Sequence, residues 1–308
     1  MAVRSTVRKL SLYSSIPHAF LLSQFDIGLL AGQKRDDLLS LWTKANQAYN
    51  NLGGPQRSFV GANDLMAING LDKNRVESVL KLMKLYSPHD SHATGLYNVR
   101  LSKLVTPQLL VNQKRAEERA NVRSGMSSAE LFDVVASSPN LTEPMTKQIL
   151  GMTQDNGAFL FTTMDEDVRN HMPVYRRVAL NDKDKNSPEF DSLSFPIGGR
   201  YPPFANVYRI RIDSVNTRLI INNGVHRLFS LASKGNIWCP LVVTDMSPQE
   251  IPDPFVNFNR EFLVNPQSNP PLLMDFLNKH VTIPLDYFPC KNTIKVNYTV
   301  ERYPTIAS

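Results

Sequence analysis

Residues 218–244 restrict the fold of this chain more than any other stretch, because they carry successive signals for strand, turn, helix and strand. A short β-branched run at 219–221 precedes the turn-forming cluster Asn-Asn-Gly at 222–224. Strand character returns at 240–243, which reads Pro-Leu-Val-Val. We therefore expect two strands joined by one short helix.

The segment between these runs has the spacing of an amphipathic helix. Its apolar residues Leu228, Leu231 and Ala232 fall on one helical face. Gly235 follows where a helix usually ends, because glycine adopts the left-handed conformation of a helix C-terminus without strain. This pattern predicts a helix over 225–234.

The first turn of this helix carries His226 and Arg227. The first N–H groups of a helix lack partners within the helix, and the helix dipole places partial positive charge there. A guanidinium beside them makes the turn suited to a phosphate or a carboxylate. Asn223, Gly224, His226 and Arg227 are therefore candidate phosphate-binding residues.

The order Asn-Gly-Val-His-Arg-Leu at 223–228 resembles the core motif of the ParB/sulfiredoxin-like superfamily. In that motif a glycine precedes a His/Arg-Arg pair at a helix N-terminus, a second glycine ends the helix, and a strand reading pro-val-val follows. Gly235 and 240–243 stand at the last two places. The match covers about a tenth of the chain, or about a third if 207–300 is counted as the domain. It implies a ParB/sulfiredoxin-like mixed sheet domain, and with the helical patterns of the first half of the chain we expect an α+β protein in which a helical N-terminal half precedes that domain.

Two departures from the motif bear on chemistry. Sulfiredoxins carry their catalytic Cys immediately before the His-Arg pair, where this chain has Val225, so sulfinic acid reduction is disfavoured. Nuclease-like branches often carry Asp before the glycine, where this chain has the neutral Asn223, a poor ligand for a divalent cation. In chromosome-partitioning ParB the equivalent turn holds nucleotide phosphates, and His226 with Arg227 fits that role.

Phosphate binding is the function that this resemblance implies, with a nucleotide or DNA as the ligand and a nucleoside triphosphate with Mg²⁺ as a candidate cofactor. Hydrolysis of a nucleotide or of nucleic acid stays open, and no catalytic residue and no protein ligand for a metal are assigned. The alternative is a non-catalytic structural protein of a larger assembly that keeps the fold as a scaffold. A binding protein needs an open electropositive cleft at Arg227, whereas a scaffold would bury Arg227 against a carboxylate.

Three more arginines are candidates for the same anion-binding surface. The run 207–212 alternates like a strand, which places Arg209 and Arg211 on one face. Arg200 lies in a Gly-Pro turn shortly before that strand. The alternative for Arg209 and Arg211 is an ordinary solvated sheet face.

The length of 308 residues favours two domains. Residues 181–188 form a polar loop of mixed charge without apolar content, and this loop marks the boundary. We expect a mainly helical N-terminal region over 1–180. A ParB/sulfiredoxin-like α/β domain is expected over 181–308, with an irregular C-terminal extension rich in Pro and aromatic residues.

The N-terminal region has helical spacing and capping signals in several places. One helix is predicted over 36–52, before a Gly-Gly-Pro stop, and another after the N-cap Asp72. The order Ser-Ser-Ala-Glu at 127–130 resembles a capping box, and a further helix is expected over 142–151. These last two helices would form a helix-turn-helix that reads DNA, or an ordinary helical hairpin, which is commoner.

Residues 246–269 are rich in Pro, Phe and Asn, too aromatic for a disordered tail. The alternatives for Phe255, Phe258 and Phe262 are stacking on bases, docking of a protein partner, and a place in the core. A possible protein partner is assigned to this segment. A helix is expected over 272–279 and an edge strand over 293–300.

Composition sets wide limits on partners and compartment. The formal net charge of +6 and the pI near 9.2 permit nucleic-acid binding without requiring it. Two cysteines without metal-ligand spacing are too few for a disulfide framework, which favours a reducing cytoplasm. The longest apolar candidate, 19–31, is interrupted by Gln24 and Asp26, so no membrane span is expected.

Overall fold

The computed structural model describes residues 7–12, 22, 26, 30–68, 70–86, 93–117, 122–136, 149–155, 158–163, 174–179, 192–197, 204–253, 255, 257–288 and 292–297. The chain divides into two compact units. The first contains Met1–Pro139 with Pro202–Phe288, and the second contains Asn140–Tyr201 with Pro289–Ser308. This division differs from a boundary at residue 180, because both units combine segments from distant parts of the chain.

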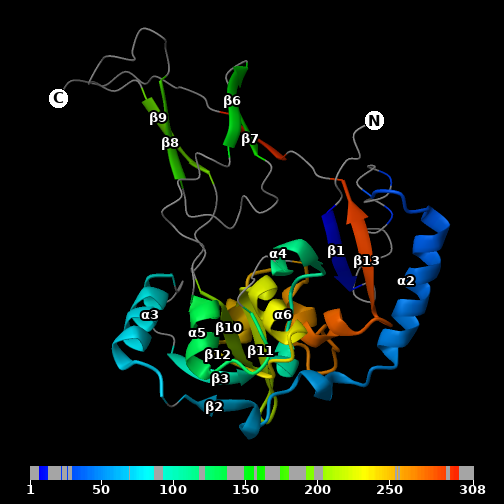
Figure 1. Ribbon diagram of the computed structural model, residues 1–308, viewed down its shortest axis with the longest axis vertical. Coiled ribbons are helices and arrows are strands. Elements are labelled where there is room, and N and C mark those ends of the chain that lie inside the picture. Colours follow the sequence, from blue (N-terminus) through cyan, green and yellow to red (C-terminus); the bar gives the residue numbers. More distant parts are fainter. Residues whose placement is uncertain are drawn as a thin grey trace. The chain divides into compact units, whose positions relative to one another are not determined.

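A six-stranded mixed sheet lies at the centre of the first unit (Figure 1). Its strands follow the order β2-β3-β12-β10-β11-β4. β10 runs parallel to β12 and antiparallel to β11. The bounds are β2 Leu65–Ala67, β3 Thr94–Arg100, β4 Leu104–Val105, β10 Asn206–Arg211, β11 Thr217–Asn223 and β12 Trp238–Met246. The unit combines helices with a mixed sheet that contains both parallel and antiparallel pairs, so the predicted α+β class is confirmed.

The predicted strand-turn-helix-strand unit is present as β11, the helix α6 (Val225–Ser233) and β12. Gly235 has a φ of 83°, and its N–H donates to the carbonyl of Ala232 at 3.0 Å. The N–H of Asn236 reaches the carbonyl of Leu231 at 3.2 Å, which completes a Schellman motif at the helix end. The glycine therefore ends α6 as the sequence predicts.

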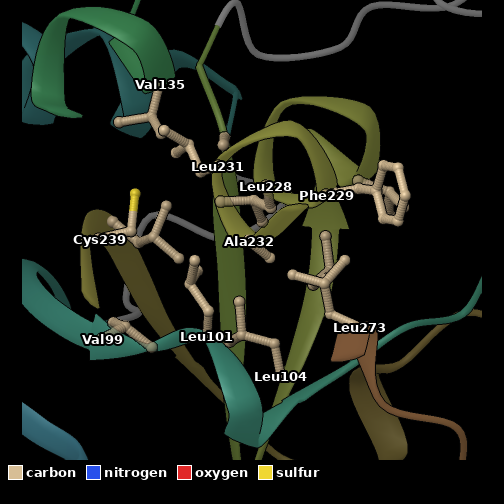
Figure 2. Packing of buried hydrophobic residues seen from close by; sticks show 14 of the residues in the cluster. Val99, Leu101, Leu104, Val135, Leu228, Phe229, Leu231, Ala232, Cys239 and Leu273 are labelled. Atoms are coloured by element: carbon tan, nitrogen blue, oxygen red, sulfur yellow. The ribbon is translucent and has the colours of Figure 1, made fainter. Parts of the chain in front are cut away.

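The apolar face of α6 packs on the six-stranded sheet. Leu228 and Leu231 have no exposed surface. Figure 2 shows them facing Leu104 of β4 and Leu101, which lies between β3 and β4. Burial of one such leucine side chain stabilises a fold by about 1.5–3 kcal/mol. Val135 joins the same cluster from a neighbouring helix, so the face of the sheet that α6 covers is a continuous core.

The strand β10 separates two hydrophobic clusters, because its side chains alternate between the faces of the sheet. Val207 belongs to the cluster that contains α6. Tyr208 and Ile210 belong to a second cluster, which also includes Phe255 and Phe258. The predicted division of this strand into two faces is therefore confirmed for its apolar residues.

The helices of the N-terminal part begin where the sequence predicts. The N–H of Arg75 donates to the N-cap carboxylate of Asp72 at 2.8 Å. The capping box is present, since Glu130 accepts from the Ser127 N–H at 2.8 Å and the Glu130 N–H donates to the Ser127 hydroxyl at 3.3 Å. The bounds are α2 Arg35–Asn50, α3 Lys73–Tyr86, α4 Gln113–Glu117 and α5 Ser128–Ala136.

A second sheet of the first unit pairs a strand near its first residues with a strand near its last residues. It has the order β13-β1-β5 and is antiparallel throughout. Its strands are β1 Val7–Leu12, β5 Leu110–Asn112 and β13 Thr282–Tyr287. The region before residue 180 thus carries strands as well as helices, and β1 pairs with a strand near the C-terminus.

Short helical segments complete the first unit. They are η1 Pro55–Ser58, η2 Ala62–Asp64, η3 Leu101–Lys103, η7 Pro248–Glu250, α7 Arg260–Val264 and η8 Leu273–Leu277. The helix predicted over 272–279 is therefore a shorter 3₁₀ helix. No helix within the described ranges has the length and apolar character needed to cross a membrane.

The second unit contains β strands in its described residues. β14-β7-β6 form one sheet and β8-β9 form another. The bounds are β6 Ile149–Asp155, β7 Ala158–Thr163, β8 Val174–Ala179, β9 Ser192–Ile197 and β14 Asn292–Asn297. The edge strand predicted over 293–300 is confirmed for 293–297, which belong to β14 and pair with β7, whereas 298–300 lie outside the described residues.

The prediction of a helix over 142–151 is wrong at its C-terminal end. Residues 149–151 belong to β6, which pairs with β7 in an antiparallel ladder. Lys147 and Gln148, which would contact DNA from the second helix of the expected helix-turn-helix, lie outside the described residues. Pairing with a neighbouring strand overrides the local helical spacing here.

Candidate functional site

The turn before α6 requires glycine for two reasons. Gly224 has a φ of 98°, a left-handed conformation that strains other residues. A Cβ added at Gly224 would lie 2.5 Å from the Cβ of Ala205 and 2.9 Å from its Cα. The glycine thus lets β11 turn into α6 in close contact with the segment that enters β10.

Arg227 is buried, with 6 % of its surface exposed. Its Nη1 donates to the main-chain carbonyl of Val135 at 2.8 Å, near the C-terminal end of α5. A cationic donor suits that end of a helix, where partial negative charge accumulates. This arginine joins α5 to α6.

His226 and Asn223 also bond to the protein main chain. The N–H of Asn112 in β5 donates to Nε2 of His226 at 3.1 Å, so this nitrogen is an acceptor. Nδ2 of Asn223 donates to the carbonyl of Phe204 at 3.1 Å. Both residues are only half-buried. The candidate phosphate-binding side chains of this turn therefore hold neighbouring segments in place.

A cavity of about 460 Å³ lies at the other end of β10. It is at the carboxyl ends of the parallel strands β10 and β12, which is where ligands bind in many α/β sheets. The lining residues are Ala93, Arg209, Arg211, Thr217, Asp245, Met246 and Ser247. Two of the arginines predicted for an anion surface therefore line one cavity.

Arg209 is held by Asp245 of the neighbouring strand. Its Nη2 donates to Oδ2 of Asp245 at 2.6 Å and its Nε to Oδ1, a bidentate pair between directly opposed residues. The hydrogen bond to Asp245 raises the pKa of Arg209. The guanidinium carbon also lies 5.6 Å from the centroid of the Tyr97 ring. Arg209 is thus fixed and locally neutralised.

Arg211 has different partners. Its Nε donates to the carbonyl of Asp213 at 3.2 Å, and its Nη2 donates to the carbonyl of Ser214 at 3.1 Å. The Asp213 carboxylate accepts from the Val215 and Asn216 N–H groups at 2.9 and 2.8 Å. These hydrogen bonds, with one from the Asn216 side chain as the largest contribution, lower the pKa of Asp213. Arg211 is exposed and is oriented by neutral carbonyl groups.

The structure does not bring Arg209 and Arg211 together with Arg227. Asn206, at the start of β10, is opposite Asn223, whereas Arg211, at its end, is opposite Thr217. Five residue steps along a strand span about 17 Å, so Arg211 and the α6 terminus are at opposite ends of β10. Arg200 lies outside the described residues.

Two neighbours of the candidate residues were not predicted. Asp245 faces Arg209 only because β10 and β12 pair in parallel, and the two residues are 36 positions apart in sequence. The strand alternation in the sequence placed Arg211 on one face of the strand. It did not predict that the carbonyls of the following turn orient the guanidinium. Pairing between distant strands determines this part of the site.

Arg218 is a buried arginine that the sequence did not single out. It has no exposed surface and donates to Ser58, Ser268 and the carbonyls of Leu263 and Asn265. Burial lowers the pKa of Arg218 to about 10. Its hydrogen bonds connect β11 to η1, to α7 and to the residues that follow α7, so we assign it a structural role.

Cys239 is unsuited to act as a nucleophile. It is completely buried at the start of β12, and burial raises the pKa of its thiol.

The aromatic segment 246–269 provides core residues. Phe255 and Phe258 are 6 % and 7 % exposed, and the ring of Phe255 lies 5.9 Å from that of Tyr208. The Phe258 and Phe262 rings stack at 5.3 Å. Burial of Phe255 and Phe258 removes these two rings from the partner-binding surface that was assigned to this segment.

Comparisons with protein-family models, with curated proteins and with solved structures find no match to this chain.

Proposed function

We propose that this protein binds a phosphate group of a nucleotide or of nucleic acid on a ParB/sulfiredoxin-like domain. The proposed family rests on the motif residues at 223–228 and on the order β11, α6, β12 in which they lie. Gly224 immediately precedes α6 and Gly235 follows it, which supports this proposal.

One observation carries the binding proposal. The cavity at the ends of β10 and β12 is open and is lined by Arg209 and Arg211. Guanidinium groups match the oxygen atoms of phosphate in geometry and charge. Arg227 is buried and bonded to the Val135 carbonyl, so it supports the contact between α5 and α6 and not the binding of a ligand.

The proposal covers binding and does not extend to hydrolysis. Over the described ranges, no group of three or more His, Cys, Asp or Glu side chains is arranged to hold a metal ion. A nucleoside triphosphate with Mg²⁺ is still one of the ligands to be tested, since Mg²⁺ can be carried by the phosphates themselves.

Isothermal titration tests this function with nucleoside mono- and triphosphates and a short DNA duplex, each with and without Mg²⁺. We expect at least one of these ligands to bind, with an affinity that falls as salt concentration rises. Binding of none of them to folded protein would refute the proposed function.

A second candidate function is a non-catalytic scaffold within a larger assembly. The buried hydrogen bond from Arg227 to Val135 favours it, because the motif arginine then stabilises the contact between α5 and α6. This candidate predicts that the purified protein binds none of the phosphate ligands and co-purifies with a protein partner from its own source.

A further inference from the structure

We infer that the Arg209–Arg211 cavity binds a small organic phosphate with one phosphate group, and not the backbone of a nucleic acid. This inference rests on the proposed function and selects one of its two ligand classes. It also assigns the site to the end of β10 that is remote from α6.

Arg211 supplies the contact to the phosphate. Its guanidinium lines the cavity and is oriented by the carbonyls of Asp213 and Ser214. These two acceptors are neutral carbonyls, and the Asp213 carboxylate, whose pKa Arg211 helps to lower, offsets only part of the positive charge. Nη1 donates no hydrogen bond to any residue that the structure describes. This side chain is therefore positioned to donate to an anion from the solvent side.

Arg209 supplies a flat surface for the organic part of the ligand. The bidentate pair with Asp245 and the Tyr97 ring hold its guanidinium plane in one orientation. A planar guanidinium stacks on aromatic groups, including nucleobases. Ala93 and Met246 add apolar surface to the same cavity.

The size and charge of the cavity favour a small ligand. Its volume of about 460 Å³ is within the range of sites for small molecules. The lining carries two guanidinium groups and the carboxylate of Asp245. One of those positive charges is paired with Asp245, which leaves a lining suited to one anionic group. A nucleic-acid backbone needs a longer row of positive groups, and Asp245 would repel a second phosphate.

Isothermal titration with adenosine 5′-monophosphate as the probe tests this inference. Inorganic phosphate, adenosine and a short DNA duplex are titrated in parallel. Two variants change the net charge of the cavity in opposite directions. Arg211→Gln removes a positive charge, and Asp245→Asn removes the carboxylate that neutralises Arg209. Arg35→Gln, at the exposed first position of α2, is the matched control for loss of one arginine.

We expect adenosine 5′-monophosphate to bind the wild type more tightly than inorganic phosphate or adenosine does. Arg211→Gln should weaken that binding about tenfold or more, because a hydrogen bond to a charged group is lost. Asp245→Asn should strengthen it, and Arg35→Gln should leave it unchanged. Thermal unfolding of each variant establishes that it is folded at the titration temperature.

The alternative outcomes separate the inference from the proposed function. Binding of the DNA duplex without binding of the mononucleotide would overturn the inference and leave the function. Equal mononucleotide affinity for the wild type and Arg211→Gln would also overturn the inference, because the ligand would occupy another site. Inorganic phosphate binding as tightly as the mononucleotide would overturn the role of Arg209. Failure of every phosphate ligand, nucleoside triphosphates included, would refute both.

Discussion

The two ends of β10 place arginines in opposite environments. At the α6 end, Arg227 is buried and donates to the Val135 carbonyl, and the neighbouring His226 accepts from a main-chain N–H. At the other end, Arg211 is exposed and lines a cavity. An arginine in the helix-starting segment 223–228 thus stabilises the fold, whereas an arginine at the far end of β10 is exposed to solvent.

This difference has a physical cause. A buried guanidinium must have its donors satisfied by the protein, since an unpaired buried charge is costly. Once those donors are used, few remain for a ligand. An exposed guanidinium that is oriented by carbonyl groups keeps its charge and part of its hydrogen-bonding capacity. The α6 end is therefore assigned to stability and the cavity end to binding.

Replacement of Arg227 should give the largest change in stability. We expect Arg227→Ala to lower the free energy of unfolding by about 3 kcal/mol, because it leaves the Val135 carbonyl without this donor and opens space in the core. Arg211→Ala should lower it by about 0.5 kcal/mol or less, as is usual for exposed side chains. Urea denaturation of both variants measures the difference, and equal losses would contradict the division between the two ends.

Substitution of Gly224 should have the next largest effect. Gly224→Ala combines a positive φ with a Cβ that would meet Ala205, and we expect a loss of about 2–3 kcal/mol. Gly235→Ala is the matched control, since Gly235 also has a positive φ but a Cβ added there would lie 3.7 Å from Oγ of Ser124, an ordinary contact distance. Its expected loss is about 1 kcal/mol. A greater loss at Gly235 would show that the close approach to Ala205 is unimportant.

Asn206, at the α6 end of β10, is expected to lower the stability of the fold. Its side chain is fully buried, and neither Oδ1 nor Nδ2 has a hydrogen-bond partner within the described part of the chain. Asn206→Leu should therefore raise the free energy of unfolding by about 1 kcal/mol. Asn236→Leu should lower it, because Nδ2 of Asn236 donates to the carbonyls of Arg123 and Leu231. Thermal and urea unfolding test the opposite signs, and a loss of stability in Asn206→Leu would contradict this account.

The capping box of α5 should give the smallest effect and a dependence on pH. Hydrogen bonds from the Ser127 N–H and hydroxyl, and from Arg123, lower the pKa of Glu130 below its ordinary value of 4.5. The stabilising contribution is therefore present above pH 4.5 and is lost as pH falls through the lower pKa of the folded state. Wild type should unfold at a higher temperature than Glu130→Gln at pH 7, and the gap should close in acid. A constant gap over this pH range would rule out the carboxylate as its cause.

Local elements were predictable from the sequence because their signals are local. The cap at Asp72, the capping box at 127–130 and the glycine at 235 act within a few residues of their helices. The strand-turn-helix-strand unit at 218–244 was predictable for the same reason. The helix expected over 142–151 failed at its end, because the ladder between β6 and β7 determines the structure there.

The environment of the candidate residues was not predictable in this way. The pairing of Arg209 with Asp245 depends on the register of β10 against β12, and the burial of Arg227 depends on the position of α5. The aromatic residues at 255 and 258 carried equal signals for core and for surface, and only the fold places them in the core. Residue types indicated anion binding, but tertiary contacts decide which arginines are open to a ligand.

Titration of Arg211→Gln and Arg227→Ala with adenosine 5′-monophosphate tests the division between the two ends of β10 most directly. Both variants are compared with the wild type at a temperature where thermal unfolding shows all three proteins to be folded. The account predicts that Arg211→Gln loses at least about tenfold in affinity, whereas the less stable Arg227→Ala keeps the affinity of the wild type. Loss of binding in Arg227→Ala with unchanged affinity in Arg211→Gln would contradict the account and return the ligand to the N-terminus of α6.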